Sequence, residues 1–355
     1  MLAKTSKIKV ESLNSILSTL KSEIRIQNFI FMFLILFYHL SFAQLQYSEY
    51  NSMAGAFSRM GFGARGMGMG NSMGAVIQGN LVSYYNPAVS VFQEKNYFHT
   101  SYSILSLDRS LNFLNFTRQF NFGKDDKNDS KLKSISGISL GIINAGISGI
   151  ERRDRQGIKY KDLSTSENQF FLNFSKTFSD NLSIGVGLKF FYYSLYEDIS
   201  SSGFGIDLGA VYRFNNNLTF AGVITDINSK YKWDTTTMYG IEGNSTTYSF
   251  PTLYKIAASY KFNNPDLLVN MEFEHSNAET NFIRVGAEYN IYQSFYLRSG
   301  IDRISLSNTD IPIRPAFGFS YFKAFNKLNI GIDYAFVVEP YSSFDQHIIG
   351  IEVLF

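Results

Sequence analysis

The chain of 355 residues has no cysteine, six prolines and a single tryptophan. The lack of cysteine excludes disulfides, thiol catalysis and thiolate metal sites. An excess of charge is also missing, with 32 basic against 30 acidic side chains, so the sequence lacks the basic footprint typical of nucleic-acid-binding proteins. Phenylalanine and tyrosine are plentiful, at 34 and 23 residues, and this composition favours strands and membrane-interface girdles over a helical core.

Long hydrophobic runs are scarce, and the one that exists lies near the start of the chain. Residues 1–28 carry several lysines and an arginine, the apolar run Phe29 to Phe42 follows, and Ala43 ends a small-residue site. This order is typical of a secretory signal peptide. The run has 14 residues, fewer than the roughly 20 that a membrane-spanning helix needs, so we expect cleavage after Ala43 rather than a retained anchor.

A glycine-rich segment, Phe57 to Val89, follows the expected cleavage site. Its glycines are Gly61, Gly63, Gly66, Gly68, Gly70, Gly74 and Gly79. Glycine lets a backbone turn tightly or lie directly against another surface. We therefore predict that this segment packs inside a structure made by the rest of the chain.

Part of that segment, Gly61 to Gly66, matches the dinucleotide-binding fingerprint G-x-G-x-x-G. The fingerprint has meaning only after a buried strand, at the start of a helix and with an acidic residue about 20 positions later. No carboxylate occurs between Glu49 and Glu94. We interpret the glycines as close backbone packing, and not as a nucleotide site.

From Asn96 onward the sequence predicts fourteen strands, each with alternating apolar and polar residues. Their ranges are 96–107, 110–122, 135–150, 167–178, 182–196, 204–214, 218–227, 252–262, 267–276, 281–291, 294–304, 314–323, 327–338 and 346–355. The clearest is 327–338, where Ile330 and Ile332 share one face and Asp333 lies on the other.

The connections decide between a soluble sandwich and a membrane barrel. They are mostly tight after even-numbered strands, as at 215–217, and mostly longer after odd-numbered ones, as at 151–166, 228–251 and 305–313. Bacterial outer-membrane barrels have short periplasmic turns, long outer loops and an even number of strands. The exception is 123–134, a long charged connection where a short turn is expected.

The predicted fold class is therefore all-β, a transmembrane antiparallel β-barrel of about 14 strands with an N-terminal glycine-rich plug segment in the lumen. The expected domains are a signal peptide at 1–43, a leader and lumen plug at 44–95, and the barrel at 96–355.

Charged residues of both signs occupy the faces that we expect to line the lumen. They are Lys189, Asp207, Arg213, Lys255, Lys261, Glu272, Glu274, Arg284, Glu288, Arg298, Asp302, Asp333 and Glu352. We expect them to pair with one another and to hold the plug. No catalytic constellation emerges, and His99, His275 and His347 are too scattered for a metal motif. We predict no enzymatic activity, no cofactor and no metal.

The last strand ends on an aromatic residue. Apolar side chains alternate outward before it, at Ile349, Ile351, Val353 and Phe355. This pattern resembles the C-terminal signal that outer-membrane barrels present to the barrel assembly machinery. With the signal peptide, it predicts a location in the outer membrane of a Gram-negative envelope, where the barrel contacts lipid.

Two short motifs carry a family resemblance. The first is Ala64, Arg65, Gly66, Met67, Gly68, Met69 and Gly70, and the second is Tyr85, Asn86, Pro87 and Ala88. Together, at this spacing behind a signal sequence, they resemble the N-terminal segment of the PorV/PorQ family, which is related to FadL-type outer-membrane transporters. The family usually continues with glycine, where this chain has Val89.

The resemblance implies two alternative functions. PorV/PorQ proteins serve type IX secretion, in which they hold or shuttle secreted proteins at the outer surface. FadL-like relatives instead transport hydrophobic small molecules through the lumen and a lateral opening. A lumen lined continuously by apolar side chains would favour transport, and a sealed lumen with large ordered loops would favour secretion. The inward charges lead us to prefer the PorV/PorQ role, with FadL-like transport as the alternative.

The longest outer loop supplies candidates for binding secreted proteins or other secretion components. Its aromatic residues are Tyr231, Trp233, Tyr239 and Tyr248. Aromatic side chains dominate the energetics of protein interfaces. A membrane-interface girdle is an equally good interpretation of Tyr231 and Trp233.

Overall fold

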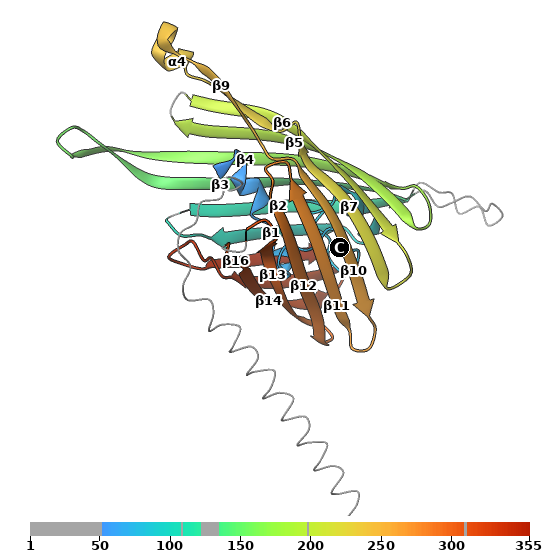
Figure 1. The fold of residues 1–355 in the computed structure, drawn as a ribbon. Helices are drawn as coiled ribbons and strands as arrows, with labels where there is room; N and C mark the ends of the chain where they lie inside the picture. The colour runs from blue at the N-terminus through green and yellow to red at the C-terminus, as the bar shows by residue number, and fades with distance from the viewer. Residues whose placement is uncertain (1–51, 108, 122–134, 197–198, 309–310) are drawn as a thin grey trace, which may run out of the picture. The chain divides into compact units, whose positions relative to one another are not determined.

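The computed structural model describes residues 52–107, 109–121, 135–196, 199–308 and 311–355. The expected signal peptide and its cleavage site lie outside these residues, as does the exceptional connection 123–134. Within the described chain, fourteen strands form a closed barrel (Figure 1) in which each strand is antiparallel to its neighbours. The predicted fold class is confirmed.

The barrel strands agree closely with the predicted ranges. They are β1 (Tyr97–Ile104), β2 (Arg109–Asn121), β3 (Ile135–Arg153), β4 (Lys159–Thr177), β5 (Leu182–Tyr196), β6 (Ile199–Arg213), β7 (Leu218–Ile227), β10 (Leu253–Phe262), β11 (Leu267–Ser276), β12 (Asn281–Tyr292), β13 (Phe295–Ser305), β14 (Arg314–Phe325), β15 (Leu328–Val337) and β16 (Gln346–Leu354). The first strand pairs with the last, β1 with β16, and this pairing closes the ring.

Two predicted loops have regular structure. Segment 151–166 is not a loop. Strand β3 continues to Arg153 and β4 begins at Lys159, so only a short turn lies between them. Segment 228–251 holds a second sheet made of β8 (Lys230–Asp234) and β9 (Ser245–Ser249). In the extended ends of β3 and β4 the side chains are largely exposed on both faces, so the sequence there carries no alternation to reveal a strand.

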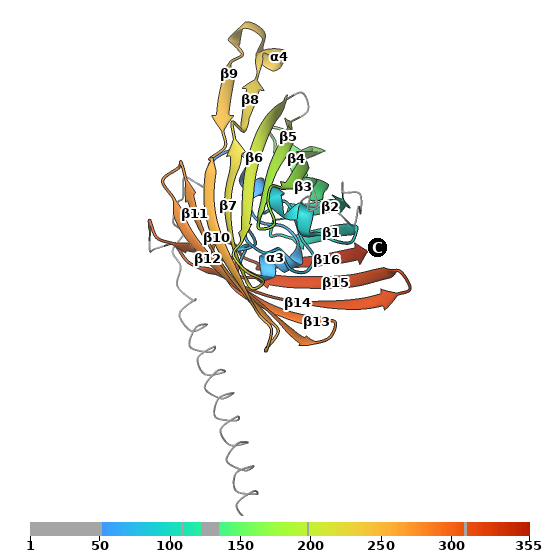
Figure 2. The same ribbon diagram turned by 90° about the vertical axis from the view of Figure 1, so that its right-hand side faces the viewer.

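The hairpin β8–β9 stands beyond the end of β7, and β8 lies beside the upper part of β6 (Figure 2). Its tip carries two short helices, α4 (Thr236–Tyr239) and η3 (Gly240–Glu242). We call the end of the barrel that bears this hairpin the loop end. The opposite end, with the tight connections such as 214–217 and 326–327, is the turn end.

The barrel wall carries apolar side chains on its outer face and polar side chains on its inner face, the reverse of a soluble protein. Ile332 is 56% exposed on the outer face, whereas Asp333 beside it is fully buried toward the lumen. Ile349, Ile351 and Phe355 of the C-terminal pattern also face outward, each close to half exposed. An outer surface of contiguous apolar side chains over a polar interior is stable in the hydrocarbon of a membrane.

The N-terminal segment enters the lumen as an irregular chain with three short helices, η1 (Ala56–Arg59), α3 (Ala64–Gly68) and η2 (Pro87–Phe92). Figure 2 shows α3 within the ring of strands. Nearly all side chains from Phe57 to Val91 are buried or half-buried. No helix in the described part of the chain is long and apolar enough to cross a membrane.

Candidate functional site: the plugged lumen

The plug, residues 52–96, touches two different parts of the barrel wall. Residues around η2 lie against the inner faces of β2–β6, which we call the η2 wall. Residues around α3 lie against the inner faces of β11–β16, which we call the α3 wall. The two walls hold the plug by different interactions.

On the η2 wall, inward-facing glycines let the plug backbone lie directly on the strands. A Cβ atom at Gly137 would overlap Ser90, and one at Gly185 would overlap the backbone of Ala88. One at Gly209 would overlap Asn86. Only glycine permits this approach at these positions.

Neutral side chains of the η2 wall then donate hydrogen bonds to plug carbonyls. Asn173 Nδ2 donates to Ser83 O over 2.9 Å, and Gln119 Nε2 donates to Val91 O over 2.7 Å. Ser183 Oγ donates to the carbonyl of Ala88 over 3.1 Å. These bonds satisfy plug backbone groups that have no secondary-structure partner.

The α3 wall holds the plug through charge. Arg65 on α3 forms a bidentate pair with Glu288 on β12, with both N···O distances at 2.8 Å. Arg298 donates to the same carboxylate over 2.7 Å. Burial opposes the charge of the Arg65 guanidinium, but the attraction of Glu288 outweighs it and raises the pKa of Arg65 above its ordinary value.

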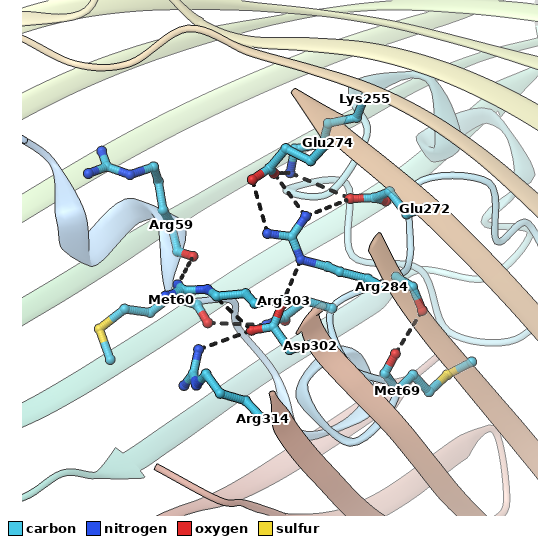
Figure 3. Close-up of polar contacts among 12 residues, drawn as sticks. Arg59, Met60, Met69, Lys255, Glu272, Glu274, Arg284, Asp302, Arg303 and Arg314 are labelled. Atoms are coloured by element: carbon cyan, nitrogen blue, oxygen red, sulfur yellow. Dashed lines mark hydrogen bonds and ion pairs between the residues drawn. The ribbon is translucent and has the colours of Figure 1, made fainter. Parts of the chain in front are cut away.

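A second ionic network lies nearer the loop end (Figure 3). Arg284 donates to Glu274 over 2.9 Å and to Asp302 over 2.7 Å, and both carboxylates are buried. The plug joins this network through Asn71, which donates to Asp302 over 3.3 Å. The amide of Gly74 donates to Glu272 over 3.1 Å. Each of these carboxylates has a partner, as buried charge requires.

The second family motif ties the two halves of the plug together. Tyr85 Oη accepts from the Phe62 amide over 3.0 Å and lies 2.8 Å from Asn71 Oδ1. Burial raises the pKa of the Tyr85 hydroxyl above its ordinary value, so it stays a neutral donor and acceptor. Asn86 caps η2 by accepting from the Ala88 amide, and its Nδ2 donates to Gly74 O over 2.8 Å. These contacts give the motif an architectural role.

The first family motif forms α3 and the turn that follows it. Met67 and Met69 are fully buried, and Gly70 adopts a φ of +60°. A Cβ atom at Gly70 would lie 2.7 Å from the backbone nitrogen of Ile301. The motif therefore combines one charge anchor, Arg65, with glycines that bring its backbone against the barrel.

The predicted lumen charges do face inward. Ten are buried, namely Lys189, Asp207, Glu272, Glu274, Arg284, Glu288, Arg298, Asp302, Asp333 and Glu352. Lys255, Lys261 and Arg213 are half-buried. Two further buried charges were not predicted from the sequence: Asp226, which pairs with Lys189 over 2.9 Å, and Arg314, which pairs with Asp302 over 3.0 Å. Both lie at strand ends, where alternation is a weak signal.

Cavities lie at both ends of the lumen, with the plug between them. At the loop end lies a cavity of about 340 Å³ with a mixed lining. Its apolar residues are Phe57, Met60, Leu105, Ala145, Ile147 and Tyr193, and its charged residues are Arg109, Glu167, Arg303, Arg314 and Glu339. At the turn end, a cavity of about 540 Å³ has Ile77, Val91 and Phe92 of the plug on one side. The lumen is thus not lined continuously by apolar side chains.

The four candidate partner residues do not form one surface. Tyr231 is buried against Phe191 and Phe250, and its hydroxyl donates to Glu167 over 3.0 Å. Burial raises the pKa of that hydroxyl, and the nearby Glu167 adds to the effect. The prediction that Tyr231 contacts a partner is wrong, because the residue is a packing element between the hairpin and the barrel.

The other three candidates lie farther out. Trp233 is half-buried, with its ring 5.2 Å from that of Tyr193. Tyr239 and Tyr248 are exposed, at 61% and 56%.

Comparison with solved structures identifies the fold. The CymD monoaromatic hydrocarbon channel matches with a TM-score of 0.56 and 14% identity, covering 83% of this chain and 97% of that one. The Ralstonia pickettii toluene transporter TbuX matches with a TM-score of 0.54 and 13% identity, covering 83% of this chain and 98% of that one. The Pseudomonas putida toluene transporter TodX matches with a TM-score of 0.52 and 15% identity, covering 83% of this chain and 96% of that one.

The chain has the fold of these hydrocarbon channels. No protein-family model and no curated protein matches it. At such low identities the likeness concerns the fold alone, so the PorV/PorQ resemblance stays a prediction.

Proposed function

We propose that the chain is an outer-membrane channel for compact hydrophobic molecules, exported by its signal peptide and closed by its plug. The proposal is supported by the apolar outer face of the barrel and by the fold shared with hydrocarbon channels. It reverses the preference that the inward charges suggested, since the fold likeness favours the FadL-like alternative.

The observation that carries this proposal is the cavity at the loop end. Phe57, Met60, Leu105 and Ile147 form an apolar part of its lining, beside charged residues, and its volume of about 340 Å³ falls within the range of small-molecule sites. Below it, the ionic network around Arg284 leaves no apolar path for a long alkyl chain, whose burial would strip charged groups of their partners. We infer a compact ligand such as a monoaromatic ring.

Passage then requires the plug to move. In the structure the plug separates the two cavities, so a bound molecule can reach the turn end only after plug contacts on at least one wall break. The channel is therefore gated by the plug, and the structure corresponds to its closed state.

Filling the cavity tests the proposal. Ala145→Trp should fill the loop-end cavity and abolish toluene binding to the purified full chain, measured by calorimetry. It should also abolish toluene entry into vesicles with a lipopolysaccharide outer leaflet. Ile142→Trp, on the outer face of the same strand, is the matched control and should retain both. Absence of toluene binding by the unmodified chain, or equal binding by both variants, would contradict the proposal.

Membrane location has its own test. Ile332→Arg should cost about 2–4 kcal/mol of folding free energy in lipid vesicles, because it places a charge on the lipid-facing surface. The neighbouring Gly331 faces the lumen, but a Cβ atom there would overlap the ring of Phe322, so Gly331→Ser is not the mild control that alternation alone suggests. Asn329→Arg, at a half-buried turn-end position, is a better control and should cost much less. Equal costs for the two arginine variants would argue against a membrane barrel.

The hairpin tip favours a second candidate function, the PorV/PorQ role in type IX secretion. Ile241 is fully exposed there, beside exposed Met238 and Tyr239. Exposed apolar side chains at the tip of a hairpin suit a protein interface. Deleting 235–247 should abolish the recovery of type IX components or secreted cargo with the barrel and leave toluene binding unchanged. Recovery that does not depend on the hairpin would count against this role.

A further inference from the structure

The seam where the barrel closes contains a cluster of three ionisable side chains that neither proposed function uses. His99 on β1 lies directly opposite Glu352 on β16, and Asp333 on β15 lies opposite Gly350 of β16. All three face the lumen, with exposures of 1%, 0% and 0%. We call His99, Asp333 and Glu352 the seam cluster.

Several atoms of the seam cluster lack partners. Among the residues that the structure describes, neither ring nitrogen of His99 has a hydrogen-bond partner, and the same holds for Asp333 Oδ2 and Glu352 Oε1. The remaining carboxylate oxygens accept from neighbours, Asp333 Oδ1 from Ser320 and Glu352 Oε2 from Asn80. Leaving buried polar atoms unsatisfied is costly. The two carboxylate oxygens can satisfy each other by sharing a proton, so the His99 nitrogens are the atoms that indicate a missing partner.

Charge around the cluster points to a cation. Arg65 and Arg298 both donate to Glu288, and Arg298 also approaches Asp333 to 3.7 Å. Two guanidinium groups thus face three carboxylates, those of Glu288, Asp333 and Glu352. One carboxylate therefore has no guanidinium partner. Because an isolated ionised carboxylate is unstable in a buried site, it must either keep its proton or bind a further cation.

We propose that the seam cluster binds a divalent transition-metal cation of the zinc type. One imidazole nitrogen and two carboxylate oxygens form a ligand set that zinc accepts, at bond lengths of about 2.0–2.2 Å. The ligand atoms lie within 4.8 Å of one another. In a tetrahedral zinc site these bond lengths place two ligand atoms roughly 3.3–3.6 Å apart, so the three side chains must move closer together when the ion binds.

The backbone around the cluster leaves room for those movements. A Cβ atom at Gly350 would lie 3.1 Å from His99 Nε2 and 3.4 Å from Asp333 Cβ. Glycine at this position therefore lets the imidazole reach across toward Asp333. A cavity of about 150 Å³ near the turn end is lined in part by Asn80, which donates to Glu352, and by Arg298, which approaches Asp333.

A bound ion would act as a clasp. It would join the first strand to the last two, and through Asn80 it would also hold the plug. A metal that binds only the closed arrangement stabilises it by mass action. The sequence contains no local metal motif for this site, because barrel closure, and not local spacing, brings His99 to Glu352.

Zinc binding by the full mature chain tests this proposal. The protein is purified without a polyhistidine tag, stripped with a chelator and titrated with zinc chloride. We expect one zinc ion per chain. We also expect the heat-induced change in the gel mobility of the barrel to occur at a higher temperature with zinc than without it. His99→Gln should weaken zinc binding at least tenfold. The control variant H275Q/H347Q removes the exposed His275 and the Tyr334-bonded His347, and should bind zinc normally.

Three outcomes would overturn the proposal. The first is the absence of stoichiometric zinc on the unmodified chain, which is expected if Asp333 and Glu352 share a proton instead. The second is undiminished zinc binding by His99→Gln. The third is loss of zinc binding in the control variant. If His99→Gln does not fold, X-ray absorption at the zinc edge of the unmodified protein decides. A nitrogen and oxygen shell containing one imidazole supports the clasp, and a shell without imidazole rejects it.

Discussion

The two walls of the lumen hold the same plug by different physics. The η2 wall offers glycines and neutral donors to the plug backbone, whereas the α3 wall offers paired charges to plug side chains and amides. A neutral hydrogen bond contributes about 0.5–1.5 kcal/mol, while removal of one partner of a buried ion pair costs about 3–5 kcal/mol. The α3 wall should therefore respond strongly to the loss of a single group, and the η2 wall mainly to steric insertion.

The absence of cysteine makes this difference measurable. Ser72→Cys places a single thiol in the plug at the α3 wall, and Ser90→Cys places one at the η2 wall. Both serines are fully buried, so thiol labelling of either position reports release of the plug from that wall.

The largest effect should come from deleting Gly61 to Gly79. The deletion removes α3 and the Arg65 anchor, and with them most contacts at the α3 wall. We expect a stable ion conductance in planar bilayers, where the intact chain conducts poorly. Heat-modified mobility in gels checks that the barrel still assembles. An assembled deletion variant that stays closed would show that the segment does not seal the lumen.

Arg65→Met should have the next largest effect. It removes the bidentate pair with Glu288. Because Glu288 keeps Arg298 as its partner, the cost to plug docking should lie at or below the about 3–5 kcal/mol expected for a buried charge with no partner. Labelling of the thiol at position 72 should accelerate far more than labelling at position 90. Lys159→Met, which breaks only exposed ion pairs with Glu151 and Asp162, serves as control and should change neither rate. Equal acceleration at both thiols would mean that the two walls act as one unit.

Gly185→Ala should produce the opposite pattern. The added methyl group overlaps the backbone of Ala88, and overpacking of this kind costs about 1–3 kcal/mol. Labelling at position 90 should accelerate more than labelling at position 72. Gly222→Ala adds the same methyl group where no atom lies within 4 Å, and it should leave both rates unchanged. If the two alanine variants behave alike, close backbone packing does not hold η2.

The smallest effect is expected for Asn173→Ala. The substitution removes one neutral donor from Ser83, worth about 1 kcal/mol, and its effect should be confined to the thiol at position 90. Asn168→Ala, on the same strand and bonded to Ser166 and Asn144 rather than to the plug, is the control. An effect as large as that of Arg65→Met would remove the distinction between the walls.

Much of the fold could be predicted because the determining signals are local. Alternation at period two marks each strand and assigns its faces, so the strand ranges, the even count and the inward charges could all be read from the residues. The signal was missing where strands leave the membrane, as in the extended β3 and β4, because neither face is buried there. Tyr231 was misplaced for a related reason, since a loop aromatic carries no sign of what it packs against.

By itself, then, the sequence determined a plugged barrel with an apolar outside, a charged inside and a glycine segment that must lie against a wall. Tertiary structure alone decided the partnerships: Arg65 with Glu288, Asn173 with Ser83, and His99 with Glu352. The physical reason is that alternation depends on a strand and its immediate surroundings, whereas each partnership depends on the register of many strands and on closure of the ring. No local pattern encodes that register.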